Sequence, residues 1–161
     1  MNKFFLYIFF IFFFLDSKQV NALDEKLLNQ IEAYLNKLNN VSSKFVQSSS
    51  NGGEDIGKIL ISKPGKLRIE YEKKKKLLIV ADGKWIHYYD TDLNEVQSII
   101  IEKSPAKILL KKNLNLKKDF SVNNLEKKSG KIILTISDKN LDNIEKINLI
   151  FSINPLELKK W

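Results

Sequence analysis

The feature that most constrains the fold is a two-residue alternation of apolar and polar side chains. Within GKLRIEYEKKKKLLIVADGKWIHYYDTDLNEV (65–96), Leu67, Ile69 and Tyr71 alternate with charged neighbours. Successive side chains of a β-strand point to opposite faces, so this period predicts a strand with one buried face. The alternation stops at a lysine run and then resumes, as expected of two strands joined by a loop.

Turn signals divide the middle of the chain into successive hairpins. NGGE (51–54), KPGK (63–66) and Asp82-Gly83 each have the Gly, Pro or Asp chemistry of tight turns. After residue 112 the alternation returns in three further stretches. The expected strands are 42–50, 56–62, 67–72, 77–81, 85–89, 96–101, 119–127, 131–137 and 145–153.

Two segments follow a helical period instead. After Asp24, a candidate N-cap, the residues Leu28, Ile31 and Leu35 recur on one face, which predicts an amphipathic helix. SPAKILLKK (104–112) predicts a short helix or apolar loop, with Ser104 as its cap. Two helices cannot cover a parallel sheet, so we expect a mainly β fold with helices (α+β), built as a curved antiparallel sheet or barrel.

The N-terminus predicts export. A positive start is followed by the apolar run Phe4–Leu15, and small residues stand at Val20-Asn21-Ala22. Twelve apolar residues are too few to span a bilayer. We therefore expect a secretory signal peptide at 1–22, cleaved after Ala22, and one mature domain at 23–161.

Charge and cysteine content exclude several classes of function. The chain carries a formal net charge of +8, yet Arg68 is its single arginine, whereas specific nucleic-acid readers depend on arginine. We expect no nucleic-acid partner, although a partner guided by charge is left open. The chain has no cysteine, which excludes a disulfide framework, a thiolate metal site and a cysteine nucleophile.

The side chains that could carry chemistry all have a structural explanation. His87 is the single histidine and lies in a strand pattern without a nucleophile-elbow motif. DTDLNE (90–95) lacks the glycine and glutamate positions of a calcium loop, and Asp82 and Asp90 both fall in turns. KKKK (73–76) is typical of a solvated hairpin loop. We predict no catalytic residue, no metal site and no cofactor.

Four stretches carry a resemblance to a known family. FVQ (45–47) after the first helix, GKILISKPGKLRIEYE (57–72), LLIVADGKWIHYYDTDLNEV (77–96) and SPAKILL (104–110) resemble LolA, the periplasmic outer-membrane lipoprotein carrier family. The resemblance implies an incomplete antiparallel β-barrel (a half-barrel) lidded by the N-terminal helix and the short central helix. It also implies a non-catalytic carrier of lipoprotein acyl chains, located in the periplasm.

The resemblance further implies partners and a binding cavity. The partners would be acylated lipoproteins, an inner-membrane lipoprotein-releasing ABC transporter, and an outer-membrane receptor or the outer membrane itself; a monomer is expected. An acyl-binding pocket must be large and mostly apolar. From the residues alone, without the resemblance, a filled core is the favoured interpretation. The candidate lining residues are Phe45, Leu67, Ile69, Tyr71, Leu78, Val80, Ile86, Tyr88, Ile108, Leu109, Leu134 and Ile136.

The chain departs from the family pattern in two places. Some members have arginine directly before the turn proline, where this chain has Lys63, so Lys63 and Arg68 are the candidate latch between barrel and lid. A lysine cannot form the forked hydrogen bonds of arginine. The chain ends at PLELKKW (155–161), which resembles the entry to further strands, so we expect the C-terminal strands of the barrel to be missing.

Two other functions remain as alternatives. A periplasmic lipid-binding sensor or a glycolipid carrier could use the same half-barrel, because a fold does not determine a function. A hydrolase would need His87 or a carboxylate pair, and the residue inventory disfavours it.

Overall fold

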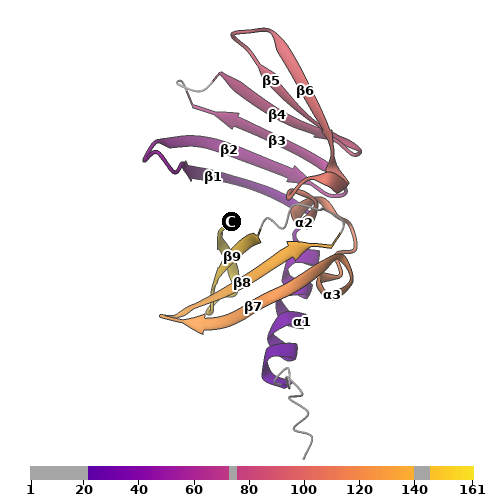
Figure 1. The fold of residues 1–161 in the computed structure, drawn as a ribbon, viewed down its shortest axis with the longest axis vertical. Coiled ribbons are helices and arrows are strands. Elements are labelled where there is room, and N and C mark those ends of the chain that lie inside the picture. The colour runs from indigo at the N-terminus through magenta and orange to yellow at the C-terminus, as the bar shows by residue number, and fades with distance from the viewer. Residues whose placement is uncertain (1–21, 73–75, 140–145) are drawn as a thin grey trace, which may run out of the picture.

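Two antiparallel sheets make up most of the computed structural model, which describes residues 22–72, 76–139 and 146–161. The first sheet is a six-stranded meander in chain order, β1 to β6 (Figure 1). The second has the order β10-β9-β8-β7. The bounds of the first sheet are β1 (Asn40–Ser48), β2 (Glu54–Ser62), β3 (Lys66–Tyr71), β4 (Leu77–Asp82), β5 (Trp85–Asp90) and β6 (Glu95–Ile100). Those of the second are β7 (Phe120–Lys128), β8 (Lys131–Asp138), β9 (Lys146–Ser152) and β10 (Glu157–Lys160).

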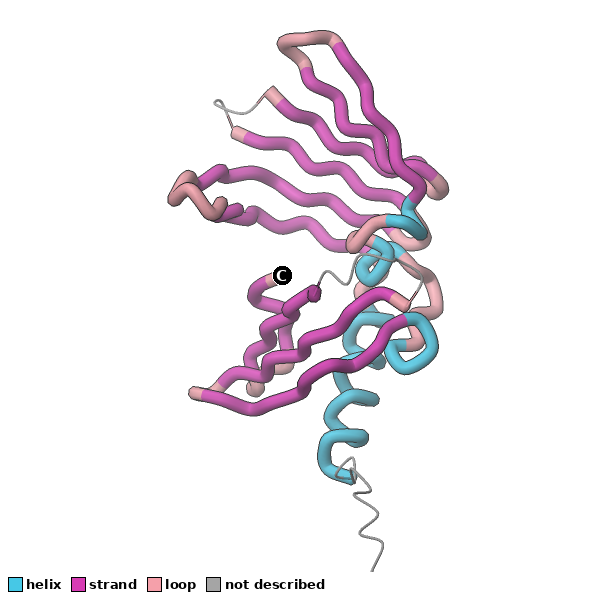
Figure 2. The backbone as a smooth tube through the Cα atoms, viewed as in Figure 1, coloured by secondary structure: helices cyan, strands magenta, loops and turns pink. Residues whose placement is uncertain are grey.

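Helical segments gather at one end of the sheets, as Figures 1 and 2 show. They are α1 (Ala22–Lys37), η1 (Ile101–Lys103), α2 (Lys107–Leu110) and α3 (Leu116–Asp119). The predicted α+β architecture is confirmed: the sheets are antiparallel and do not close into a barrel. The β1–β2 connection lies at the sheet end that points away from the helices (Figure 1).

The first helix forms where the apolar period predicts it, but it begins earlier. Leu28, Ile31 and Leu35 are buried, and Leu27 joins them. The predicted N-cap role of Asp24 is wrong, because α1 begins at Ala22 and Asp24 lies in its first turn. An acidic residue there is still favourable, since it faces the positive end of the helix dipole.

The segment after β6 differs from the prediction in detail. The helix at 107–110 forms, but its N-cap is Ala106, so Ser104 does not cap it. A third helix, α3, follows and was not expected. The Asn115 side chain caps it by accepting a hydrogen bond from the Lys118 backbone N–H at 2.8 Å. Asparagine is among the best N-cap residues, so this signal was present in the sequence.

Both sheets and all the helices contribute to one hydrophobic cluster. Ile31 and Leu35 of α1, Ile108 of α2, Leu134 of β8 and Phe151 of β9 are fully or almost fully buried in it. No helix within the described ranges is both long and apolar enough to span a membrane. The predicted signal peptide at 1–22 lies almost entirely outside the described residues.

A buried ion pair joins α2 to the second sheet. Lys107 Nζ contacts the Asp138 carboxylate at the end of β8, and the two side chains are only 3% and 5% exposed. The Lys107 ammonium also lies 5.1 Å from the centre of the Phe120 ring, a cation–π contact. Removing one member of such a pair leaves an uncompensated charge in the core.

Lys107→Met should therefore destabilise the fold by about 3 kcal/mol, because it removes the buried cation that contacts the Asp138 carboxylate. Urea unfolding would measure the change. Lys111→Met is the matched control: Lys111 pairs with Asp119 at 2.6 Å but is 34% exposed. Its loss should cost about 1 kcal/mol or less. Equal losses in the two variants would contradict this reading.

Candidate functional site

One face of the six-stranded sheet is mostly apolar, with polar residues on its two edge strands and at its outer end. Residues paired across neighbouring strands lie on the same face, so the register defines rows that run across the sheet. We call this surface the apolar face; its three rows follow, starting from the helical end. The first row is Val41, Ile61, Leu67, Ala81, Ile86 and Ile99; the second is Ser43, Ile59, Ile69, Ile79, Tyr88 and Gln97; the third is Phe45, Gly57, Tyr71, Leu77, Asp90 and Glu95.

Burial on the apolar face decreases with distance from the helices. In the first row Ile61, Leu67, Ala81 and Ile86 are buried. In the second row only Ile79 is buried, and the apolar residues of the third row are half-buried except for Gly57. The helices therefore cover one end of this face, and a band of partly exposed apolar side chains remains beyond them. The band consists of Phe45, Ile59, Ile69, Tyr71, Leu77 and Tyr88.

Aromatic side chains form the outer part of this band. The Phe45 and Tyr71 rings meet edge to face, with centroids 5.4 Å apart and planes at 84°. Phe45 lies across Gly57, where a Cβ would be 2.6 Å from two ring atoms, so the glycine leaves room for the ring. Burial raises the pKa of Tyr88, and the neighbouring Tyr71 raises it further. At its outer end the band carries hydroxyl groups as well as rings, and the Tyr71 hydroxyl donates a hydrogen bond to Gln47 Oε1 at 2.6 Å.

Six of the predicted cavity residues lie on the apolar face: Phe45, Leu67, Ile69, Tyr71, Ile86 and Tyr88. The placement of Leu78 and Val80 was wrong. They pair with Glu70 and Arg68, which puts them on the opposite face. LLIVA (77–81) is apolar at every position and therefore has no readable alternation. The hairpin register selects Ile79 and Ala81 instead.

The remaining four predicted cavity residues lie in the filled core. Ile108 and Leu109 of α2, and Leu134 and Ile136 of β8, are at most 6% exposed. They belong to the filled core and not to the band. Sequence reasoning missed Ile59 and Leu77, which belong to the band; the alternation of Ile59 with Ile61 was a usable signal.

The turn between β2 and β3 contacts the C-terminal ends of two helices. Lys63 Nζ donates a hydrogen bond to the Leu35 carbonyl of α1 at 2.8 Å, and Gly65 N–H donates to the Leu110 carbonyl of α2 at 2.9 Å. Carbonyls in the last turn of a helix lack the usual i+4 partner, and that of Leu35 also accepts the Leu38 N–H at 3.3 Å. Burial lowers the pKa of the Lys63 ammonium. The second candidate latch residue, Arg68, was wrongly placed: it pairs with Glu70 on the opposite face, 2.6 Å away.

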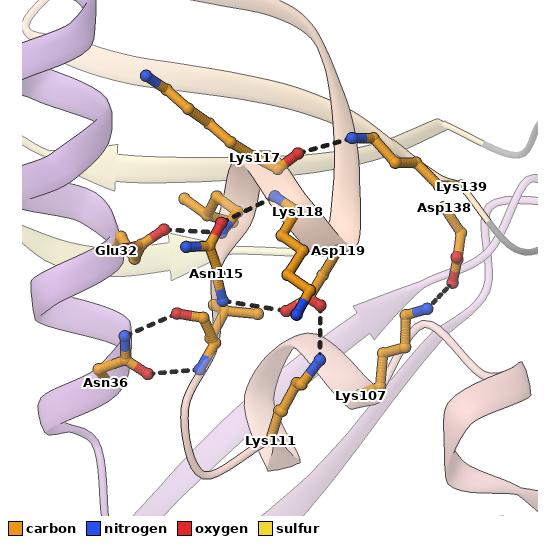
Figure 3. A network of polar contacts seen from close by, with 12 residues as sticks. Glu32, Asn36, Lys107, Lys111, Asn115, Lys117, Lys118, Asp119, Asp138 and Lys139 are labelled. Atoms are coloured by element: carbon orange, nitrogen blue, oxygen red, sulfur yellow. Dashed lines mark hydrogen bonds and ion pairs between the residues drawn. The ribbon is translucent and has the colours of Figure 1, made fainter.

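A polar network fastens α1 to the segment between α2 and β7 (Figure 3). Asn36 exchanges two hydrogen bonds with the Leu114 backbone, at 2.9 and 2.8 Å, and Glu32 accepts one from the Leu116 N–H at 2.7 Å. Burial opposes ionisation of Asp119, but hydrogen bonds from Lys111 and the Asn115 N–H hold its pKa below the ordinary value. These contacts hold Leu114 and Leu116 in the core.

A hollow of about 440 Å³ lies over β1, β2 and β3. Six of its nine lining residues belong by register to the face opposite the apolar face. They are Asn40, Ser42, Leu60, Ser62, Lys66 and Arg68. Because this hollow is separate from the open apolar band, it is not the candidate site.

His87 lies on that opposite face as a strand residue, as predicted. Its Nδ1 is 2.8 Å from Ser98 Oγ, and its Nε2 is 3.4 Å from Asp82 Oδ2. The Asp82 carboxylate lies at the β4–β5 turn, where it accepts the Trp85 and Lys84 N–H groups. These two hydrogen bonds lower the pKa of Asp82 to about 2. Asp90 accepts two turn N–H groups in the same way, on the other face. Among the described residues no group of three or more acidic or histidine side chains could hold a metal ion.

Comparison with known proteins gives a consistent result. The family model described as "Outer membrane lipoprotein carrier protein LolA" matches residues 36–161. The curated outer-membrane lipoprotein carrier protein of Chromobacterium violaceum is 34% identical over 121 residues, which are 71% of this chain and 58% of that protein. The one from Cupriavidus pinatubonensis is 30% identical over 142 residues, 80% of this chain and 66% of that protein.

A further relative covers nearly the whole chain. The outer-membrane lipoprotein carrier protein of Legionella pneumophila is 30% identical over 162 aligned residues, 97% of this chain and 78% of that protein. The chain spans less than two thirds of the length of the first two relatives.

Lys63→Met should destabilise the fold by about 1.5–3 kcal/mol, because the Leu35 carbonyl loses a charged hydrogen-bond donor. The loss should appear in urea unfolding and as faster amide exchange in the last turn of α1. Lys58→Met, on the exposed side of β2, is the matched control and should change little. Unaltered exchange in α1 after Lys63→Met would show that the contact does not hold the helix.

The folded-state pKa of Asp82, about 2, lies below its unfolded value. Its contribution to stability is therefore present above about pH 4 and is lost as the pH falls towards 2. Carboxyl NMR titration should give a pKa near 2, and Asp82→Asn should flatten the loss of stability between pH 4 and 2. An ordinary aspartate pKa, or an unchanged slope in the variant, would contradict this assignment.

Proposed function

This chain belongs to the LolA family of outer-membrane lipoprotein carrier proteins, and from that premise we propose that its apolar face binds the acyl chains of lipoproteins in the periplasm. The observation that carries the proposal is the band of half-buried side chains beyond the helices, which contains Phe45, Ile69, Tyr71 and Tyr88. A sheet face that served only as a core would be covered along its length. This one is covered at one end.

Acyl chains fit such a surface on energetic grounds. Each methylene removed from water contributes about 0.8 kcal/mol, and a protein with several acyl chains stays on a membrane nearly irreversibly. A carrier must therefore offer apolar area that is already partly exposed, so that little of its own packing is lost when cargo binds. The band meets this requirement, because the backbone hydrogen bonds of the sheet fix the positions of its residues while their side chains remain half-exposed.

The carrier cycle we propose has three parts. The signal at 1–22 directs export with cleavage after Ala22, and the domain at 23–161 receives acylated lipoproteins from an inner-membrane ABC transporter. It then delivers them to a receptor in the outer membrane or to the outer membrane itself. No step of this cycle requires a catalytic group or a cofactor, in keeping with the structural role of His87 and of the turn aspartates.

Lys63 is the residue we propose as a latch between sheet and helices. Its bond to the Leu35 carbonyl joins the β2–β3 turn to α1, and the adjacent Gly65 joins the same turn to α2. Movement of the helices away from the covered end would lengthen the apolar band. A lysine makes one such bond at a time, whereas an arginine could make two in parallel, so Lys63→Arg should hold the helices more firmly.

Ile69→Glu should weaken binding of a fluorescent fatty-acid probe about tenfold or more, because a carboxylate would have to be buried against the acyl chain. Val80→Glu is the matched control: it adds the same charge on the opposite face, across from Arg68, and should bind normally. The apolar-face assignment would be overturned if Val80→Glu lost binding and Ile69→Glu kept it.

Release of lipoproteins from spheroplasts tests the carrier role itself. The wild-type protein should capture acylated lipoprotein in a soluble complex, and Ile69→Glu should capture far less. Binding of the probe without any capture of lipoprotein would favour the alternative, a lipid-binding sensor or glycolipid carrier on the same fold.

A further inference from the structure

Strand β6 is an exposed edge of the six-stranded sheet. In the part of the chain that the structure describes, β6 pairs only with β5, and every residue from Glu95 to Ile99 is exposed. Val96 is 58% exposed and Ile99 37% exposed, on opposite faces of the strand. Figure 1 shows β6 at the rim of the sheet, away from the second sheet. An edge of this kind is a template for another strand.

The other edge strands are protected in ways that β6 is not. β7 has a register irregularity between Val122 and Asn124 and two lysines at its end, and β10 is four residues long with two lysines and a shift of its own. β1 carries Lys44 in its middle. Lysines, irregularities and short length are the usual devices that prevent edge pairing. β6 has a regular register with β5 throughout and contains no lysine, arginine or proline.

The side chains of β6 suit a partner strand that is itself uncharged and partly apolar. Residues 96–101 read VQSIII, six uncharged positions between Glu95 and Glu102. Apolar side chains occur on both faces, Val96 and Ile100 on one and Ile99 on the other. A charged partner strand would leave its charges against these side chains, so the matching partner is another strand with the same pattern.

We propose that β6 pairs antiparallel with β6 of a second copy of this chain, forming a two-fold dimer with one continuous sheet. A two-fold axis perpendicular to the sheet keeps each face continuous and closes the assembly at two copies. An axis at Ser98 places Val96 opposite Ile100 of the partner subunit, twice, on the face that carries His87. The proposal does not depend on lipid binding, because this pairing leaves the apolar band uncovered.

Charges at the two ends of β6 support antiparallel self-pairing. Glu95 begins the strand and Asp92 lies in the β5–β6 turn, paired with Lys76 at 3.5 Å, whereas Lys84, Glu102 and Lys103 stand where the strand ends. The Ile101 N–H donates to the Lys84 carbonyl at 3.0 Å, which places Lys84 at that end. In an antiparallel pair Glu95 of each copy approaches the end of the partner subunit that carries these two lysines and one glutamate. Opposite charges across paired strands are stabilising.

The interface is small, and the association should be correspondingly weak. A six-residue strand is about 20 Å long, and a single strand pair buries far less than the roughly 1,600 Å² of a standard stable interface. The dimer should therefore form at high micromolar concentrations and dissociate on dilution. The expectation of a monomer would still describe the dilute protein.

Ser98→Cys tests both the partner and the register. The chain has no cysteine, so any disulfide would join two copies at residue 98. Residues directly opposite on antiparallel strands have Cα atoms about 4.5–5.5 Å apart, within the range that a disulfide spans. Mild oxidation of the purified protein should give a dimer, whereas the control Asn124→Cys on the β7 edge should stay monomeric. Dimers from Asn124→Cys but not from Ser98→Cys would overturn the proposal.

Ser98→Lys tests the wild-type equilibrium without a cross-link. It places two ammonium groups opposite each other at the axis, which should raise the dissociation constant about fivefold or more. Sedimentation equilibrium from about 10 μM to about 1 mM would measure it, with Asn124→Lys as the control of equal charge. Both variants should bind the fatty-acid probe like the wild type. A wild-type monomer throughout this range, or equal effects of the two lysines, would overturn the proposal.

Discussion

The structure depends on a mismatch between the apolar area of the first sheet and the helical surface available to cover it. Six strands in register place three rows of side chains on one face, and burial is concentrated in the first row, with Ile79 of the second. Packing at that end stabilises the fold. Beyond it, apolar side chains stay half-exposed because no further element lies over them in the described part of the chain. The same feature that limits the core leaves open the surface that we propose as the binding site.

Polar contacts decide where the helices lie. The amide of Asn36, the carboxylate of Glu32 and the ammonium of Lys63 all bond to backbone groups of other elements. The Lys107–Asp138 pair adds a buried charge contact between α2 and β8. Such contacts specify position more than they add stability, since a buried ion pair gains little over a hydrophobic substitute.

The two faces and the edge of the six-stranded sheet serve different purposes. The apolar face offers the area that we propose for acyl chains, while the opposite face carries Arg68, Glu70 and His87 in contact with water. The β6 edge offers backbone groups and uncharged side chains to another strand. Because all three belong to one hairpin meander, a single register assigns each side chain to its role.

The sequence by itself determined the strand-rich architecture, the order of the hairpins and the identity of most band residues, because alternation and turn chemistry are local properties. Ile69 and Tyr71 could be assigned since charged residues separate them. Leu78 and Val80 could not, because in an unbroken apolar run only pairing with β3 decides which residues face inward. The helix contacts of Lys63 and the exposure of β6 were also decided by tertiary structure, since both depend on elements far apart in the chain meeting, or failing to meet, in space.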